Sequence, residues 1–570
     1  MGALAAKIQK ELDAWYRADR GLFPLSELMR NSARDFGTLP ALRSWNGKGY
    51  TAYTYSEVSE TVDAVARWLI DFGLERGGMA AVLGENRPEW ATAYLAIQTA
   101  GGTVVPVDRL LPSSGIRHII SDSGASILFV SGQLKDVIDE MADIPGLKTI
   151  VCFDSAACNG EVVSWHDVVE KGKGLDVELP KREMDELAAL LYTSGTTGHS
   201  KGVMLSQKNI MSNVASCSRI LPLGPDDTFL SVLPVHHSYE ATAGFLLPLY
   251  CGCSITYARS LKSNELLEDM KNTNVTIMLG VPLLFEKMHQ GVVRGLKKKG
   301  KAVQTLFNTL YGISSTGERM NKKWGRKLFQ SIRTKAGMGT VKWFISGGGP
   351  LDPEDSLFFN RLGLHMMQGF GLTETSPVTH LTPQWRIRHD CIGPPIPDVE
   401  HKLIDVNEEG VGELCLRGPN IFEGYFKNPE ATAEVKGEDG WFRTGDLAII
   451  HEDNYVQITG RRKNMLVTGG GKNVYPEEIE YHLNRSLFIA ESLVLGVPRE
   501  KGRGEEIGAL VVPDYEQMDL YFEEHDGQKP TSEAEVLALI KTEIKKALKD
   551  LEEYKQVRHL KLMQEEFQKT

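Results

Sequence analysis

The chain has 570 residues, of which 42% are hydrophobic and 24% charged, a composition typical of a globular protein with roughly two to four domains. Its formal net charge of −11 argues against nucleic acid as the main partner, because phosphate backbones are recognised by clustered positive charge. No stretch of about 18 uninterrupted apolar residues is present, so the sequence predicts no membrane-spanning helix.

Charged residues interrupt the N-terminus where a secretory signal would be continuously apolar, so we expect a cytoplasmic protein. The 7 cysteines are scattered along the chain and form no CxxC pair. This predicts reduced, mostly buried thiols, with neither a disulfide framework nor a structural zinc site. The sequence leaves open whether the protein touches a membrane surface and in which oligomeric state it occurs.

Short apolar runs alternate with helical stretches along the first part of the chain. The run 79–83 indicates a buried strand, Pro88 begins a helix that extends to about Ala100, and 104–107 indicates the next strand, which together form a βαβ unit. Further strands are predicted at 126–130, 149–153, 275–279, 342–345 and 364–367. Strands of this kind predict an α/β fold with parallel sheets, which bind ligands at the carboxyl ends of their strands.

The pattern changes between about residues 385 and 460, where short strands are separated by Gly, Pro and Asn turns. Strands are predicted at 399–404, 412–417 and 455–459, which indicates a small antiparallel or barrel-like β unit. Helix and strand then alternate again, with a helix near 532–551. We therefore predict a large N-terminal domain over residues 1–460, which includes the barrel-like part, and a small α+β C-terminal domain over 461–570.

A loop rich in glycine and hydroxyl side chains follows the predicted strand 187–192. Glycines let backbone N–H groups approach phosphate oxygens, hydroxyls donate further hydrogen bonds, and Lys201 supplies a positive charge. The segment is not a Walker A loop, because Lys201 lies six residues after Gly195 and is followed by Gly202. It predicts a loop that wraps a polyphosphate.

This loop, residues 193–203, is similar to the TSGTTGxxKGV phosphate loop of the adenylate-forming superfamily. Four further motifs follow in the order of that family, at 346–350, 368–375, 441–447 and 460–463. From about residue 50 onward the chain resembles an AMP-dependent acyl-CoA synthetase, most of all a long-chain fatty acid–CoA ligase. The resemblance implies ATP, Mg²⁺ and coenzyme A as ligands. It also implies a mobile C-terminal domain that rotates between two half-reactions about a hinge within 460–464.

The resemblance also assigns roles to single residues. Glu374, a hard oxygen ligand, would bind Mg²⁺, and Thr373 would contact phosphate. Asp446 would accept the ribose hydroxyls, and Arg461 would steady the ribose and the α-phosphate. Catalysis is assigned to Lys201, Thr373, Glu374 and Arg461. Nucleotide or CoA binding is assigned to Thr193, Ser194, Gly195, Thr196, Thr197, Gly198, Lys201, Gly347, Gly348, Gly349, Gln368, Gly369, Phe370, Gly371, Thr373, Asp446, Arg461, Gly469, Gly470 and Gly471, of which the last three would approach the pantetheine tunnel.

Two apolar segments are candidates for an acid-binding pocket. His237 corresponds to a family histidine that lines the acyl pocket, and Gly280, Val281 and Pro282 correspond to the next pocket segment of long-chain acyl-CoA synthetases. Both segments suggest a chain-like carboxylic acid, but both could equally be plain core. An aryl acid therefore stays open as the substrate.

The predicted function is an AMP-forming acyl-CoA synthetase, which converts ATP, a medium- or long-chain fatty acid and CoA into acyl-CoA, AMP and pyrophosphate through an acyl-adenylate. Its partners would be these small molecules. One alternative is an adenylating enzyme for an aryl or other acid, or for loading a carrier protein. A second is a silent acyl- or nucleotide-binding protein, because the family's adenylation lysine lies in a segment that the sequence, after Lys569 and Thr570, does not reach. We expect the natural chain to continue past Thr570.

Overall fold

The computed structural model describes residues 10, 11, 13, 19–141, 143–154, 162–193, 200–320, 323–469, 472–499, 504–524, 529–549, 551–565 and 567. Its residues form two compact units. The large unit comprises Met1–His401, Leu416–Phe442 and Glu452–Tyr455, and the small unit comprises Lys402–Cys415, Arg443–His451 and Val456–Thr570. The domain boundary predicted at residue 460 stays a prediction.

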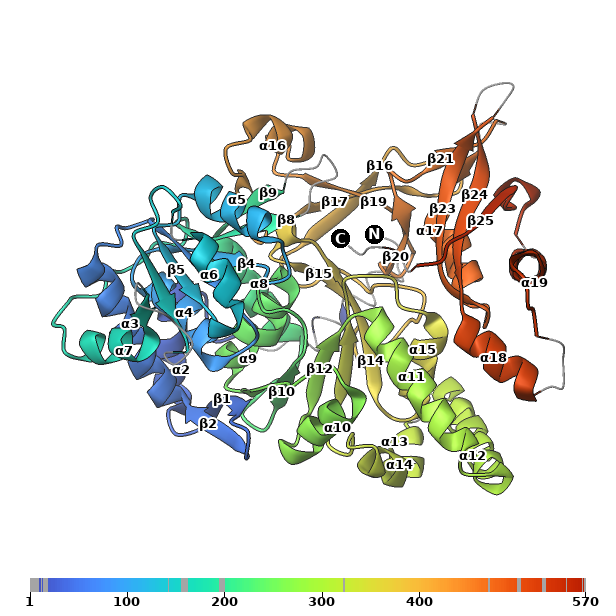
Figure 1. Ribbon diagram of the computed structural model, residues 1–570, viewed down its shortest axis with the longest axis horizontal. Helices are drawn as coiled ribbons and strands as arrows, with labels where there is room; N and C mark the ends of the chain where they lie inside the picture. The colour runs from blue at the N-terminus through green and yellow to red at the C-terminus, as the bar shows by residue number, and fades with distance from the viewer. Residues whose placement is uncertain are drawn as a thin grey trace. The chain divides into compact units, whose positions relative to one another are not determined.

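The large unit contains two eight-stranded sheets (Figure 1). The first has the strand order β18-β9-β8-β4-β3-β5-β6-β7. Its strands are β3 (Met79–Leu83), β4 (Thr103–Val107), β5 (Ile127–Val130), β6 (Thr149–Cys152), β7 (Val163–Ser164), β8 (Leu187–Thr193), β9 (Lys201–Ser206) and β18 (Gly424–Tyr425). The strands from β7 to β8 are parallel, whereas β9 is antiparallel to both of its neighbours, β8 and β18.

The second sheet has the order β15-β14-β13-β12-β10-β11-β1-β2. Its strands are β1 (Pro40–Trp45), β2 (Tyr50–Thr54), β10 (Thr228–Ser231), β11 (Ser254–Tyr257), β12 (Ile277–Gly280), β13 (Trp343–Ser346), β14 (His365–Gly371) and β15 (Val378–Leu381). The six inner strands are parallel, and β2 and β15 add antiparallel edges. Inner strands such as β13 are buried along their whole length, as expected for parallel strands covered on both faces.

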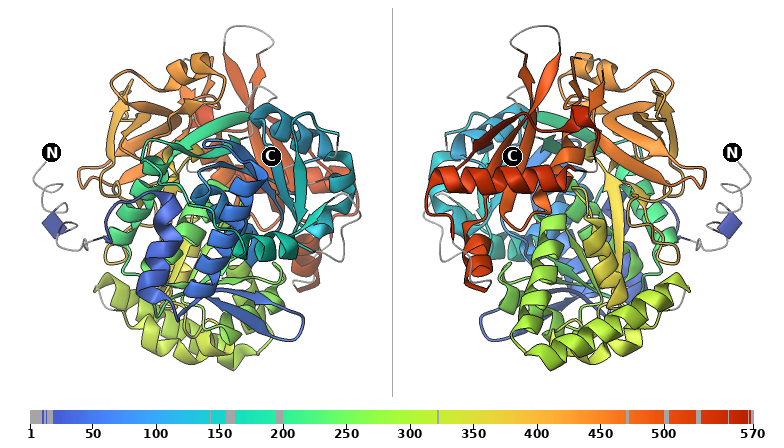
Figure 2. Two further views of the ribbon diagram at one scale, coloured as in Figure 1. Left: turned by 90° about the vertical axis from the view of Figure 1, so that its left-hand side faces the viewer. Right: turned by 90° about the vertical axis from the view of Figure 1, so that its right-hand side faces the viewer.

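Helices cover the faces of these sheets (Figures 1 and 2). The helices of the large unit that matter below are α3 (Tyr55–Phe72), α4 (Pro88–Thr99), α8 (Gln207–Ile220), α11 (Pro282–Lys297), α12 (Lys301–Arg319), α13 (Gly325–Leu328), α14 (Gln330–Lys335) and α15 (Pro353–Arg361). Local sequence explains their ends. In α3, Thr54 and Glu57 form a capping box, and Gly73 ends the helix at a φ of 99°, a left-handed conformation that glycine adopts without strain.

The small unit contains most of a four-stranded sheet in the order β16-β17-β19-β20. These strands are β16 (Glu400–Ile404), β17 (Gly412–Arg417), β19 (Phe442–Ile450) and β20 (Val456–Arg461). A three-stranded sheet of β23 (Ile489–Pro498), β24 (Glu505–Pro513) and β25 (His559–Leu562) follows, together with α17 (Pro476–Asn484), α18 (Tyr515–Glu524) and α19 (Glu533–Ala547). Apolar residues of β23, β24, α17 and α19 share one core. The predicted α/β class, with a small antiparallel β unit and an α+β C-terminal part, is confirmed.

The cysteines agree with the sequence prediction in part. Cys217, Cys251, Cys253, Cys391 and Cys415 are free thiols. Cys152 is disulfide-bonded, so the prediction of reduced thiols throughout the chain is wrong at this position. Among the described residues, no helix has both the length and the apolar character that crossing a membrane requires.

Candidate active site

The carboxyl ends of parallel strands bring two predicted binding segments together. Gly280 at the end of β12 pairs with Ser346 at the end of β13, and Ser346 pairs with Gln368 in β14. The Gly347 N–H donates to the Gly280 carbonyl at 3.1 Å. The predicted acyl segment 280–282 and the glycine loop 347–349 therefore lie next to each other, at the sheet edge where open α/β sheets bind ligands.

Tyr239 packs directly against this glycine loop. A Cβ atom on Gly347 would lie 3.0 Å from Cε1 and Cζ of the Tyr239 ring, which is closer than nearly all Cβ contacts in proteins. The Tyr239 hydroxyl donates to the Ile345 carbonyl at 3.0 Å and so holds the ring in place. A side chain at position 347 would therefore force the Tyr239 ring or the glycine loop to move by a few tenths of an ångström.

The predicted phosphate loop connects the antiparallel strands β8 and β9, in which Thr193 and Lys201 are opposite each other. Its residues Ser194, Gly195, Thr196, Thr197 and Gly198 lie outside the described part of the chain. On the other side of β9, Tyr425 of β18 pairs with Val203. The Lys201 ammonium lies 4.9 Å from the centroid of the Tyr425 ring, which is a cation–π contact.

Tyr425 also contacts the predicted metal ligand. Its hydroxyl donates to Glu374 Oε1 at 2.8 Å. Burial, together with the negative charge of Glu374, raises the pKa of Tyr425 well above its usual value, so the phenol stays a hydrogen-bond donor. Glu374 lies in the 3₁₀ turn Thr373–Thr375, whose backbone is held by the Phe422 N–H, which donates to the Glu374 carbonyl at 2.9 Å. Lys201, Tyr425 and Glu374 therefore form one chain of contacts.

Thr373 extends this chain to the segment that follows β10, because its hydroxyl lies 3.2 Å from Ser238 Oγ. The carboxylate of Glu374 would hold a Mg²⁺ ion, whereas the hydroxyl of Thr373 and the ammonium of Lys201 would hold phosphate oxygens. Mg²⁺ in nucleotide sites is usually held by one or two carboxylates together with substrate phosphates. The residues present therefore suit the metal that the sequence predicts.

The segment after β10 holds a buried carboxyl group. Glu240 begins a π-helical stretch (Glu240–Leu246) and is only 1% exposed. Burial raises its pKa to about 8, although Ser231 Oγ donates a hydrogen bond to Oε1 at 2.5 Å. His237 lies three residues earlier, and burial lowers its pKa, so its imidazole is neutral near pH 7.

Asn86 holds this segment in place from the end of another strand. Its side-chain amide donates to Ser231 Oγ at 2.8 Å and to the Leu233 carbonyl at 2.6 Å. Its carbonyl oxygen accepts from the Val235 N–H at 3.0 Å. The turn that carries His237 is thereby fixed by one residue of the first sheet's βα connection.

In the small unit, Asp446 of β19 and Arg461 of β20 are paired opposite each other. Arg461 Nε lies 3.1 Å from Asp446 Oδ1, and the Asp446 side chain is 4% exposed, whereas that of Arg461 is 59% exposed. These two predicted ribose-binding residues therefore form an ion pair at one edge of the four-stranded sheet. Of the predicted pantetheine loop, Gly469 is described, whereas Gly470 and Gly471 lie outside the described residues.

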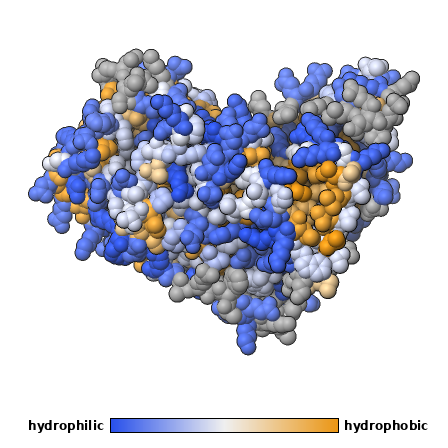
Figure 3. Space-filling view, turned by 90° about the horizontal axis from the view of Figure 1, so that it is seen from below, coloured by the Kyte–Doolittle hydropathy of each residue, from blue (hydrophilic) through white to orange (hydrophobic). Residues whose placement is uncertain are grey.

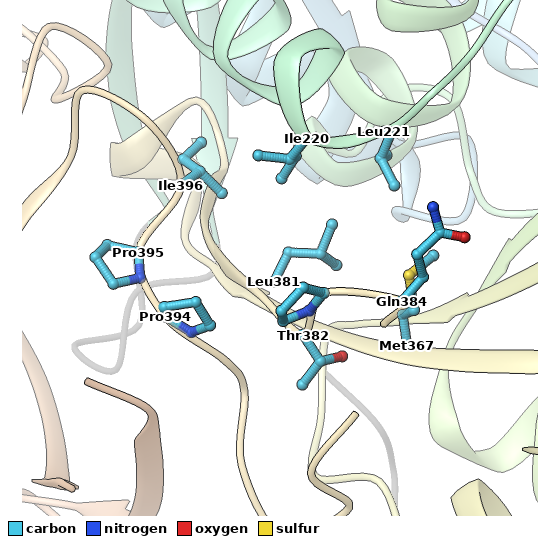
Figure 4. A pocket seen from close by; sticks show the side chains of 10 residues that line it. Ile220, Leu221, Met367, Leu381, Thr382, Gln384, Pro394, Pro395 and Ile396 are labelled. Carbon is cyan, nitrogen blue, oxygen red and sulfur yellow. The ribbon is translucent and has the colours of Figure 1, made fainter. Parts of the chain in front are cut away.

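A pocket opens on the large unit between the end of α8 and strands β14 and β15 (Figure 4). It is lined by Ile220, Leu221, Met367, Leu381, Thr382, Pro383, Gln384, Pro394, Pro395 and Ile396. Its lining includes none of the predicted site residues, although Met367 is the neighbour of Gln368 in β14. Most of the lining side chains are apolar, so this pocket supplies no chemistry of its own.

Comparisons with known proteins agree with this geometry. Residues 29–426 match the family model of AMP-binding enzymes. The long-chain-fatty-acid–CoA ligase ACSBG2 of Rattus norvegicus is 30% identical over 499 residues, which cover 83% of this chain and 75% of that protein. Fatty acyl-CoA synthetase A of Dictyostelium discoideum is 28% identical over 529 residues, covering 88% of this chain and 78% of that protein.

Among solved structures, ATP-bound MatB from Rhodopseudomonas palustris superimposes with a TM-score of 0.74 at 26% sequence identity, and the alignment covers 96% of each chain. The family match and the fold define an adenylate-forming enzyme. The chain belongs to the AMP-binding enzyme family and, within its adenylate-forming superfamily, to the acyl-CoA synthetases.

Three residues of the site were missed by sequence reasoning: Tyr239, Glu240 and Tyr425. Tyr239 and Glu240 directly follow His237 and Ser238. The sequence predicted a role for this segment, but it did not predict that Tyr239 contacts the glycine loop or that Glu240 is buried against Ser231. Tyr425 lies in Gly424–Tyr425, a two-residue strand that carries no local hydrophobic pattern. Its position beside β9, one of the two strands that the predicted phosphate loop connects, was therefore not predictable from hydrophobic periodicity.

Proposed function

We propose that this acyl-CoA synthetase is AMP-forming and acts on a medium- or long-chain fatty acid, with ATP and CoA as its other substrates and Mg²⁺ as its metal. The chain of contacts from Lys201 through Tyr425 to Glu374, with Thr373 beside it, is the observation that carries this proposal. It combines a cation, a carboxylate and a hydroxyl, the groups needed to hold a metal–triphosphate complex.

In the first half-reaction, the carboxylate of the fatty acid would attack the α-phosphorus of ATP, and pyrophosphate would leave. Lys201 and Thr373 would donate hydrogen bonds to phosphate oxygens as negative charge develops on them. Glu374 would hold Mg²⁺, which offsets phosphate charge when it is bound. Tyr425 would keep Glu374 in position through its hydrogen bond to Oε1.

In the second half-reaction, the thiolate of CoA, formed by loss of the thiol proton, would attack the acyl carbonyl, and AMP would leave with its phosphate intact. Asp446 and Arg461, paired in the small unit, would hold the ribose and α-phosphate by resemblance. Rotation of a C-terminal domain about residues 460–464 would exchange the reagents between the two steps. A cytoplasmic location remains part of this proposal.

The preference for a fatty acid rests on two observations. The segment 280–282 is apolar and adjoins the glycine loop 347–349. Two relatives that are 30% and 28% identical are named a long-chain-fatty-acid–CoA ligase and a fatty acyl-CoA synthetase. An acid with a flexible apolar chain would gain affinity from such a surface, in proportion to the apolar area that it buries.

The test is the formation of AMP and acyl-CoA from ATP, Mg²⁺ and CoA across a panel of linear acids of increasing length, one aryl acid and one dicarboxylic acid. We expect AMP release that requires an acid and is highest for a linear fatty acid. Highest activity with the aryl or the dicarboxylic acid would overturn the substrate class. ADP as the product would overturn the attack on the α-phosphorus. A carrier protein that accepts the acyl group better than CoA would overturn the thiol acceptor.

A further inference from the structure

The segment 282–335, which spans helices α11 to α14, has a charge opposite to that of the chain as a whole. It contains thirteen Lys and Arg residues but only two Asp and Glu residues, a net charge of +11 in a protein whose formal net charge is −11. Ten of these cations are described and exposed: Lys287, Arg294, Lys297, Lys298, Lys299, Lys301, Lys323, Arg326, Lys327 and Lys335. A strongly acidic protein therefore carries one concentrated basic region.

The cations at the two ends of α12 have no acidic partners among the described residues. No described carboxylate forms an ion pair with Lys297, Lys298, Lys299 or Lys301 before the helix, or with Lys323, Arg326 or Lys327 after it. Of the two acids in the segment, Glu318 binds Arg361 at 3.0 Å, and Glu286 accepts a hydrogen bond from Gln290. Within the described part of the chain, no carboxylate therefore neutralises these seven cations.

Between these two groups of cations, α12 exposes an apolar stripe. Val303, Leu306 and Ile313 of α12, together with Met320 directly after it, are 38%, 60%, 42% and 58% exposed, and their spacing places them along one side of the helix. The adjoining side of the helix is fixed to the core, where Phe307 is buried and contacts Phe329. Because this packing sets the rotation of the helix, the stripe stays at the surface. Hydrophobic side chains gather in a patch bordered by hydrophilic ones on the face that α12 lines (Figure 3).

We propose that this basic apolar surface, defined by α11, α12 and the cations at both ends of α12, docks onto an anionic lipid membrane. A helix with aliphatic side chains on one side and lysines around it lies in the interface of a bilayer, with its apolar side chains among the acyl chains and its cations on the headgroups. Each Lys or Arg near an anionic surface adds to the attraction, and salt screens this contribution. A symmetric contact with a second copy would instead bring two regions of +11 together, which is repulsive.

The same surface continues into the predicted acyl segment. Helix α11 begins at Pro282, and its neighbours Val281 and Leu283 are 38% and 41% exposed apolar residues. If the substrate is a fatty acid, as proposed above, docking would place the predicted acyl segment 280–282 near the lipid bilayer, in which such an acid dissolves. This last step rests on the proposed function, whereas the binding of the membrane does not.

The test is co-sedimentation of the full chain with vesicles of phosphatidylcholine alone and with vesicles that contain roughly 30% phosphatidylglycerol, at low and at high salt, without substrates. We expect binding to the anionic vesicles that falls as salt is raised, and at least tenfold weaker binding to neutral ones. The triple variant Lys297→Glu, Lys298→Glu, Lys299→Glu and the double variant Leu306→Asn, Ile313→Asn should each lose at least tenfold in vesicle binding.

Two matched controls test whether a loss of vesicle binding is specific to the α12 surface or follows from any loss of positive charge or of an exposed apolar side chain. The variant Lys541→Glu, Lys545→Glu, Lys546→Glu reverses three exposed lysines of α19, and Leu487→Asn removes another strongly exposed leucine. Both should bind vesicles as the unmodified chain does. All variants should keep their activity on a water-soluble medium-chain acid, which shows that they fold.

Failure of the membrane proposal and failure of the proposed function are distinguishable. Equal binding to neutral and anionic vesicles, no binding to either, or unchanged binding by the α12 variants would overturn the membrane proposal, even if ligase activity is intact. A dimer that the Leu306→Asn, Ile313→Asn variant converts to a monomer would also overturn it, because a second copy would then cover the stripe. Vesicle binding by a chain that forms no acyl-CoA would leave the docking surface standing and remove the proposed function.

Discussion

The hydroxyl of Tyr425 donates a hydrogen bond to Glu374 Oε1 at 2.8 Å, while its ring lies 4.9 Å from the Lys201 ammonium. One tyrosine therefore contacts both the predicted metal ligand and the predicted phosphate ligand. Its two functions can be separated, because phenylalanine keeps the ring and removes only the donor.

Tyr425→Phe should lower kcat/KM for ATP by about tenfold or more, the usual effect of losing a hydrogen bond to a charged group. Because Glu374 is the affected partner, the Mg²⁺ concentration that gives half-maximal activity should rise. Tyr425→Leu, which also removes the ring, should raise the KM for ATP further. Tyr50→Phe is the matched control. Tyr50 lies in β2, at the edge of the second sheet opposite β15, and its hydroxyl also donates a hydrogen bond to a carboxylate, that of Asp269. An unchanged Mg²⁺ dependence in Tyr425→Phe would remove the positioning role.

Glu374→Gln should abolish acyl-adenylate formation, with a loss of at least about 1,000-fold, because a neutral amide neither binds Mg²⁺ well nor balances its charge. Pyrophosphate release that depends on fatty acid measures this step. The melting temperature should change by no more than about 2 °C, since Glu374 is not part of the core. The exposed Glu430→Gln is the matched control. Near-normal activity in Glu374→Gln would refute the metal assignment.

Gly347→Ala should weaken the binding of ATP several-fold, because the new methyl group would lie 3.0 Å from the Tyr239 ring and push the glycine loop aside. Gly349→Ala should have a smaller effect, since its methyl group would meet Pro282 at an ordinary 3.5 Å. The KM for ATP of the two variants provides the comparison. A larger effect at Gly349 would show that contact with Tyr239 does not determine the position of the loop.

Glu240 should make the stability of the large unit depend on pH. Its pKa is raised to about 8 in the folded chain, above the ordinary value near 4.5, so the folded state holds a proton that the unfolded chain has lost between these two pH values. The stabilisation is therefore present below about pH 4.5 and decreases as the pH rises toward 8, by up to about 1.4 kcal/mol per pH unit.

Glu240→Gln removes this titration, so the melting temperature of the variant should fall less between pH 5 and pH 8 than that of the unmodified chain. Glu430→Gln again serves as the control, because Glu430 is exposed. Parallel curves for Glu240→Gln and the unmodified chain would mean that Glu240 is ionised throughout this range.

Much of the fold was predictable because the signals are local. The strands predicted at 342–345 and 412–417 occur at Trp343–Ser346 and Gly412–Arg417, and the helix predicted from Pro88 ends at Thr99. Each is bounded by its own apolar run and by nearby Gly or Pro. The glycine loop 347–349 was recognisable for the same reason, since it directly follows a buried strand.

The sequence by itself determined the α/β class, the family and the residue types of the site, because hydrophobic periodicity and short motifs act over a few neighbouring residues. Tertiary structure alone decided that Tyr425 meets Glu374, 51 positions away, and that Asn86 holds the turn after Ser231, 145 positions away. It alone decided that Leu306 and Ile313 face outward while Phe307 faces the core. Such contacts depend on strand order and helix rotation, which result from packing the whole unit at once and leave no pattern in any single stretch of sequence.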